Sequence, residues 1–97
     1  MKTPEGYEKD EICKFLDSLE LECWYFRPTM GGYGKSGVSD IIGSYRGRFF
    51  GIEVKREGKG PTVLQQRRMA DIRTSGGTAF AGTASIVIPL FRKFFGL

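Results

Sequence analysis

Apolar residues recur at helical spacing near the start of the chain. The stripe consists of Ile12, Leu16 and Leu19, with Phe15 beside it. Thr3 and Pro4 form a favourable helix start, because threonine can cap the first turn and proline suits the first helical position. We therefore expect a helix from Pro4, with Glu5 extending the inward stripe at its N-terminal end and Lys9 pointing elsewhere.

The pattern then changes to that of β-strands. The runs that predict strands are 23–27, 38–45, 48–56 and 78–81. The first is rich in aromatic side chains and ends at Pro28. Between the second and third, Arg46-Gly47 contains the glycine that a two-residue hairpin turn requires.

This turn predicts which residues of the hairpin face one another. Tyr45 faces Arg48, and the numbers of paired residues sum to 93, so Asp40 lies opposite Glu53. Directly opposed side chains have Cβ atoms roughly 4.5–5.5 Å apart, where like charges repel. We therefore expect a cation between the two acids. Lys55 projects from the same face as Glu53, because strand side chains alternate with period two.

A second helix follows the hairpin. Thr62 is its expected N-cap, and the helix runs to about residue 75, where two glycines end it. Gln65, Met69 and Ile72 share one stripe, so Gln65 points inward among apolar neighbours and needs a hydrogen-bond partner. A glutamine buried for purely structural reasons is the ordinary alternative.

The order helix, three strands, helix, strand predicts an α/β fold with a mixed sheet. The apolar and aromatic tail, residues 86–95, predicts a short helix that covers the core or a second subunit. The 97 residues suit one domain, residues 1–97, with a modest core.

Composition narrows the function. There is no histidine, which removes serine–histidine and cysteine–histidine catalysis and histidine-ligated zinc. No apolar run approaches the ~20 residues of a membrane-spanning helix, and the start does not resemble a signal peptide. We expect an intracellular protein whose Cys13 and Cys23 are free thiols.

The net charge of +4 favours a polyanionic partner, although a solvated basic surface is the alternative. The candidate nucleic-acid contacts are Lys35, Arg46, Arg48, Arg56, Lys59, Arg67 and Arg68. Lys35 belongs to a glycine-rich loop that contains Gly-Lys-Ser. This loop lacks the earlier glycine of a phosphate-binding P-loop, because that position is Thr29, and a strand follows it instead of a helix. We therefore expect no nucleotide cofactor.

Asp40, Glu53, Lys55 and Gln65 together suggest phosphodiester chemistry. Two carboxylates suit a hard divalent cation such as Mg²⁺, which typically takes one or two carboxylates and keeps several waters. Lys55 would stabilise charge on the phosphate or orient the attacking hydroxide, and Gln65 could hold Lys55 or that water. Glu5 has two interpretations: an acid favoured by the helix dipole, or a carboxylate aimed at the metal.

These residues resemble a known family. The motifs are Gly37-Val38-Ser39-Asp40-Ile41-Ile42-Gly43, Phe50-Gly51-Ile52-Glu53-Val54-Lys55, and Pro61-Thr62-Val63-Leu64-Gln65 followed by Gly76-Gly77. They are similar to those of VRR-NUC nucleases in the PD-(D/E)XK superfamily, over residues 3 to about 82. The opening Thr3-Pro4-Glu5-Gly6 is similar to short phage-type members, which implies a phage or prophage origin. Ser39 departs from the proline that often precedes the aspartate.

The resemblance implies roles for these residues. Asp40, Glu53 and the main-chain carbonyl of Val54 would hold Mg²⁺ or Mn²⁺, with Glu5 as the first-helix acid near the metal. Lys55 would be the catalytic lysine. Gln65 would be the supporting glutamine.

The resemblance also implies a metal-dependent DNA endonuclease, similar to homodimeric resolvases of four-way junctions. A non-catalytic basic module that binds nucleic acid on the same fold is the alternative, and a small dimerising scaffold is a third. Acids that face DNA would not help a pure binding module, which favours the nuclease.

Overall fold

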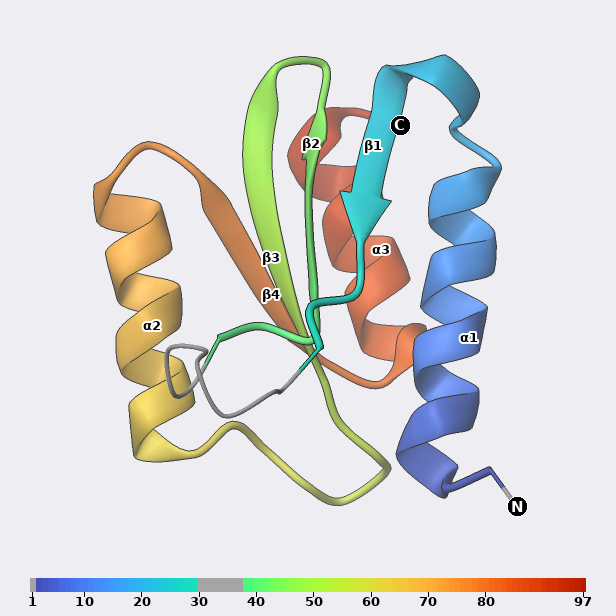
Figure 1. Cartoon of the computed structure of the whole chain (residues 1–97), viewed down its shortest axis with the longest axis vertical. Helices are drawn as coiled ribbons and strands as arrows, with labels where there is room; N and C mark the ends of the chain where they lie inside the picture. Colours follow the sequence, from blue (N-terminus) through green and yellow to red (C-terminus); the bar gives the residue numbers. More distant parts are fainter. Residues whose placement is uncertain (1, 30–37) are drawn as a thin grey trace.

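A four-stranded mixed sheet with three α-helices around it forms the fold of the computed structural model, which describes residues 2–29 and 38–97 (Figure 1). The elements are α1 (Pro4–Asp17), the 3₁₀-helix η1 (Glu20–Glu22), β1 (Cys23–Phe26), β2 (Ile41–Tyr45), β3 (Arg48–Val54), α2 (Val63–Thr74), β4 (Thr78–Gly82) and α3 (Ala84–Phe95). The α/β class and the mixed sheet are as expected. The glycine-rich loop with Lys35 lies outside the described residues.

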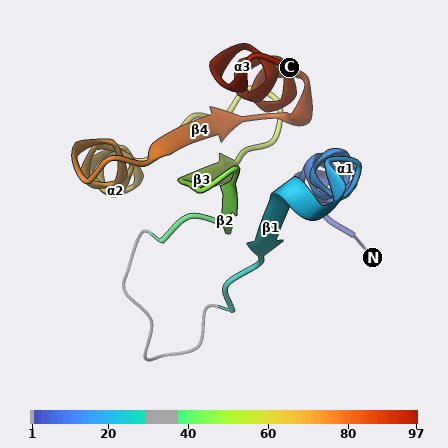
Figure 2. The same ribbon diagram turned by 90° about the horizontal axis from the view of Figure 1, so that it is seen from above.

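The sheet has the order β1-β2-β3-β4, with β3 antiparallel to β2 and parallel to β4. Helices α1 and α3 lie on one face, and α2 lies on the other (Figure 2). Helix α2 packs against β3 and β4. None of the helices in the described part of the chain has the length and apolar character needed to cross a bilayer.

The core fills the space between the sheet and the helices α1 and α3. Phe91 of α3 stands at its centre and is fully buried. Its ring makes edge-on contacts with Phe15, Tyr45 and Phe50 at centroid distances of 5.5, 5.7 and 5.3 Å. Such pairs add to the stabilisation that apolar burial already supplies. The tail therefore covers the core of its own chain, one of its two predicted roles.

The helix starts follow from their caps. Thr3 accepts the Gly6 N–H at 3.0 Å, as predicted. Thr62 accepts the Gln65 N–H at 3.2 Å. At the start of α3, Thr83 makes no side-chain cap, and Glu8 of α1 accepts the Ala84 N–H at 2.8 Å instead. The first N–H groups of a helix have no partner within that helix. Here a side chain of α1 supplies the missing acceptor for the first turn of α3.

The predicted hairpin register is confirmed: Tyr45 pairs with Arg48 and Ile41 with Ile52. Arg46 and Gly47 both have positive φ, 50° and 84°, as a type I′ turn requires. The second strand is shorter than expected and begins at Ile41. The physical reason is that the Asp40 side chain, and not a backbone carbonyl of this strand, accepts the Val54 N–H. The ladder between the two strands therefore ends at Ile41.

Candidate active site

Asp40 and Glu53 come together where the β2–β3 ladder ends. Asp40 Oδ2 accepts a hydrogen bond from the Val54 N–H at 2.8 Å, which fixes this carboxylate against β3. Continuing the observed register by one pair from Ile41 and Ile52 places Asp40 opposite Glu53. The predicted opposition of the two acids therefore holds in the structure.

Glu53 is buried, with 3% of its surface exposed. Burial raises the pKa of Glu53 to about 8, and a hydrogen bond with Asp40 together with the negative charge of Asp40 acts in the same direction. The charge of Lys55 lowers this pKa, and that of Glu5 raises it. Glu53 therefore keeps its proton at neutral pH, as expected for one of two acids that share a site.

Gln65 joins Glu53 to α2. Its Nε2 donates to Glu53 Oε1 at 2.7 Å, while its Oε1 accepts the Thr62 N–H at 2.8 Å. One side chain thus completes the capping box of α2 and orients an acid of the site. The predicted inward direction of Gln65 is confirmed, and its partner is Glu53.

Lys55 follows directly after β3 and is half-buried. Its backbone N–H donates to the Gly82 carbonyl at 2.9 Å, which ties it to the end of β4. The effect of its charge on the pKa of Glu53 places it within electrostatic reach of the acids. Glu5, in the first turn of α1, is half-buried and acts on the same carboxyl.

Lys9 was predicted to point elsewhere, and this prediction was wrong. Its Nζ lies 3.8 Å from Asp40 Oδ1, while Oδ2 of the same carboxylate accepts the Val54 N–H. The helical stripe of α1 gave no signal for this contact, because the partner comes from the start of β2. Lysines are common in the first turns of helices that also carry acids, so the sequence alone does not identify Lys9 as a partner of Asp40.

The donors at this place fit a hard divalent cation. Asp40 offers a carboxylate, Glu53 would offer a second one after releasing its proton to solvent, and Val54, whose N–H binds Asp40, would add its main-chain carbonyl. Among residues 2–29 and 38–97, no three or more acidic, cysteine or histidine side chains converge as a ready-made metal cluster. A cation here would take few protein ligands and keep waters, which is typical of Mg²⁺.

The predicted basic contacts are spread over the molecule. Arg56 and Lys59 are exposed in the segment that follows Lys55, on the side of the acids. At the far end of the hairpin, Arg46 pairs with Glu22. Arg48 lies over the Phe94 ring of α3, 4.9 Å from its centroid. On α2, Arg67 is exposed and Arg68 lies 3.5 Å from Asp71. Of the predicted contacts in the described part of the chain, Arg56 and Lys59 follow Lys55 in sequence, and the others belong to the tip of the hairpin and to α2.

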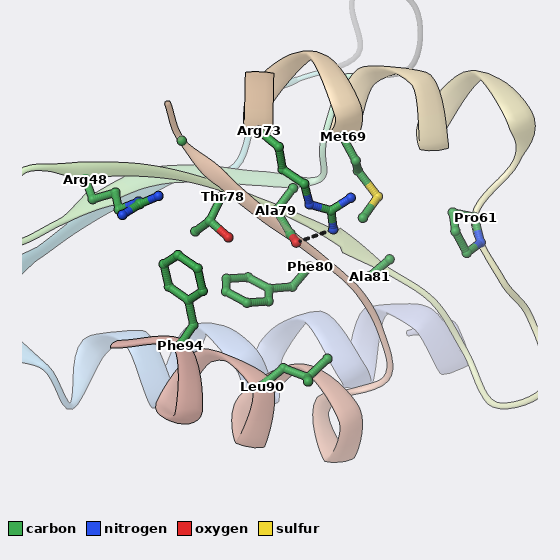
Figure 3. Close-up of a pocket in the computed structure, with 11 residues that line it drawn as sticks. Arg48, Pro61, Met69, Arg73, Thr78, Ala79, Phe80, Ala81, Leu90 and Phe94 are labelled. Atoms are coloured by element: carbon green, nitrogen blue, oxygen red, sulfur yellow. Dashed lines mark hydrogen bonds between the residues drawn. The ribbon is translucent and has the colours of Figure 1, made fainter. Parts of the chain in front are cut away.

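A cavity of about 620 Å³ lies beside β4 at the edge of the sheet, and neither Asp40 nor Glu53 lines it. Figure 3 shows Met69 and Arg73 reaching into it from α2, and Leu90 and Phe94 from α3. Arg73 donates to the Ala79 carbonyl at 2.8 Å along the edge of β4. The lining of this cavity is largely apolar and contains no carboxylate. The hypothesis of metal-dependent phosphodiester cleavage therefore does not apply to this cavity.

No protein-family model, curated protein or solved structure matches this chain. The functional assignment therefore rests on the residues of the chain itself.

Proposed function

We propose that this chain is a divalent-metal-dependent DNA endonuclease with a PD-(D/E)XK-type core. One observation carries the proposal: Asp40 and Glu53 meet at the end of β3, with Lys55 two residues after Glu53 and Gln65 bonded to Glu53. A raised pKa on a buried acid with a specific charged partner is typical of functional sites. The parallel β3–β4 pair and the flanking helices are compatible with such a core.

Each residue has a distinct task in this proposal. Asp40, Glu53 and the Val54 carbonyl hold the cation, and Glu5 approaches from α1. When bound, the cation polarises the phosphodiester and stabilises charge on the leaving oxygen. Lys55 donates to a phosphate oxygen or orients the attacking water.

Two contacts hold the acids in position for this task. The Val54 N–H fixes one oxygen of Asp40, and Gln65 fixes Glu53. Because both acids are held by rigid elements, little rearrangement is needed before reaction.

We extend the proposal to a homodimer that cuts branched DNA. The exposed apolar side chains of Ile86, Leu90 and Phe94 form a stripe on α3 beside the free edge of β4, and such a surface can bury against a second copy. Two active sites related by a twofold axis suit symmetric cleavage of a junction. Sedimentation that finds only monomers with and without DNA would remove this extension.

The test is cleavage of a labelled four-way junction beside a linear duplex, with Mg²⁺, Mn²⁺ or EDTA. We expect metal-dependent cutting that favours the junction. Asp40→Asn, Glu53→Gln and Lys55→Ala should each lower the cleavage rate by about a hundredfold or more, because each removes a group that acts on the reacting phosphate or its cation. Circular dichroism checks that each variant is folded.

Matched controls are available on the same chain. Glu57→Gln removes an exposed acid close to the site in sequence, and Lys93→Ala removes an exposed lysine of α3. Both should cut like the original protein. If two of the three site variants cut normally, the site assignment is wrong. Tight binding without cutting under any metal would instead favour the non-catalytic binding module.

A further inference from the structure

The sheet face that carries Asp40 and Glu53 continues into a row of exposed aromatic side chains. Trp24 of β1 pairs with Ser44 of β2, and Ser44 pairs with Phe49 of β3, so these three residues form one row across the sheet. The next row toward the acids holds Phe26, Ile42 and Gly51. The row after that is the one that the acids occupy, about 7 Å further along the strands.

These aromatic rings are not part of the core. Trp24, Phe26 and Phe49 are 65%, 44% and 45% exposed, and we refer to them together as the aromatic surface. The Trp24 and Phe26 rings lie 5.4 Å apart. Side chains of β1 that alternate with them, Cys23 and Tyr25, pack on the core instead. The aromatic surface therefore faces away from α1 and α3, on the side where α2 packs mainly against β3 and β4.

A cavity of about 210 Å³ borders the aromatic surface, and neither Asp40 nor Glu53 is among the residues that line it. Phe49 and Ile42 line one part of it, and Ser39, the residue before Asp40, lines another. Arg68 and Asp71 of α2 also line it. A strand held by its phosphate at Asp40 and Glu53 would lie on the same sheet face as these rings, with the Arg68 guanidinium at the cavity between α2 and the sheet.

We propose that the aromatic surface binds unpaired nucleobases next to the scissile phosphate by stacking. The inference rests on the proposed function, since that function brings a DNA strand to this face. Every base has a π-face, so flat exposed rings on a sheet bind single strands with little sequence preference. A surface of this kind selects branched or frayed DNA over intact duplex, because only unpaired bases can reach the rings.

Trp24 is the only tryptophan of the chain, so its fluorescence reports directly on this surface. The experiment titrates the whole protein in EDTA with a single-stranded oligonucleotide of about a dozen nucleotides, and separately with a blunt duplex of the same sequence. We expect the single strand to quench Trp24 emission and the duplex to leave it largely unchanged. Cleavage cannot interfere, because no metal is present.

Substitutions then test the contact. Phe49→Ala should weaken single-strand binding about tenfold or more, as loss of one stacked base predicts. Phe49→Leu, which keeps apolar bulk but no ring, should weaken it similarly. The matched control is Tyr7→Ala, because Tyr7 is also an exposed aromatic residue (61%) but belongs to α1, on the other face of the sheet. This control should bind like the original protein.

The outcomes separate this inference from the proposed nuclease. Unchanged Trp24 emission at saturating single strand, or equal losses from Phe49→Ala and Tyr7→Ala, would overturn the stacking surface, even if Asp40→Asn abolishes cleavage. Trp24 emission that changes with protein concentration but not with added single strand would also overturn the stacking surface. It would indicate that the aromatic surface binds a second copy of the chain. Quenching by single strands without cutting under any metal would support stacking and defeat the nuclease.

Discussion

Glu53 is held in a position that favours its neutral form, and this has a consequence for stability. The folded protein keeps the proton of Glu53 up to a pKa of about 8, whereas the unfolded chain releases it near the ordinary value of 4.5. Between these values the folded state binds more protons than the unfolded state. The free energy of unfolding therefore decreases as the pH rises through this window.

Glu53→Gln should remove this dependence. We expect the variant to match or exceed the original protein in stability near pH 8, because no buried carboxyl has to ionise, while it loses cleavage. Urea unfolding followed by circular dichroism between about pH 5 and about pH 9 measures this. The exposed Glu57→Gln should keep the original slope. A slope in Glu53→Gln as steep as that of the original protein would contradict the prediction.

Lys9 lies close to Asp40 Oδ1, and its positive charge competes with a cation for this carboxylate. Lys9→Met should therefore raise the affinity for Mn²⁺, by up to about fivefold, given that partly exposed ion pairs contribute at most about 1 kcal/mol. Calorimetric titration of the metal-free protein measures this without any reaction. Lys14→Met, an exposed change on the same helix, is the control. Weaker Mn²⁺ binding in Lys9→Met would show that this lysine supports the metal site instead.

At the level of elements, the contact between α1 and α3 is the one most open to test. Glu8→Ala removes the side-chain acceptor of the Ala84 N–H at the start of α3 and should lower the free energy of unfolding by about 1 kcal/mol, the usual effect of losing a helix cap. Glu8→Gln keeps an acceptor oxygen and should lose less. Urea unfolding compares both with Glu11→Ala, an exposed change on α1. Equal stability of Glu8→Ala and Glu11→Ala would contradict this role.

Local chemistry explains which elements could be predicted. The caps at Thr3 and Thr62 and the Arg46-Gly47 turn depend on residues a few positions apart, so the sequence was enough to place them. The position of the turn sets the strand register, and counting residue pairs outward from the turn placed Asp40 opposite Glu53. The contact of Glu8 with Ala84 spans 76 positions and depends on how α1 and α3 pack, which no spacing rule contains.

At the level of the whole molecule, the class was predictable and the coverage of the sheet was not. Apolar and polar residues alternate in the strand segments, and apolar residues recur at helical spacing in the segments between and around them. This pattern predicted the α/β class. How far α2 extends over the sheet depends on its packing against β3 and β4, and Trp24 of β1 stays exposed. The activity stays a prediction that the cleavage assay tests.

The two-residue turn also limits how this protein can change over generations. Surface loops usually accept insertions and deletions, but one residue gained or lost at Arg46-Gly47 would slip the register and turn one strand's side chains to the opposite face. Asp40 would then no longer face Glu53, although neither acid had been substituted. Substitutions in this turn should therefore be tolerated far better than changes in its length. The length of the hairpin tip is constrained because it determines whether Asp40 faces Glu53 at the other end of the hairpin.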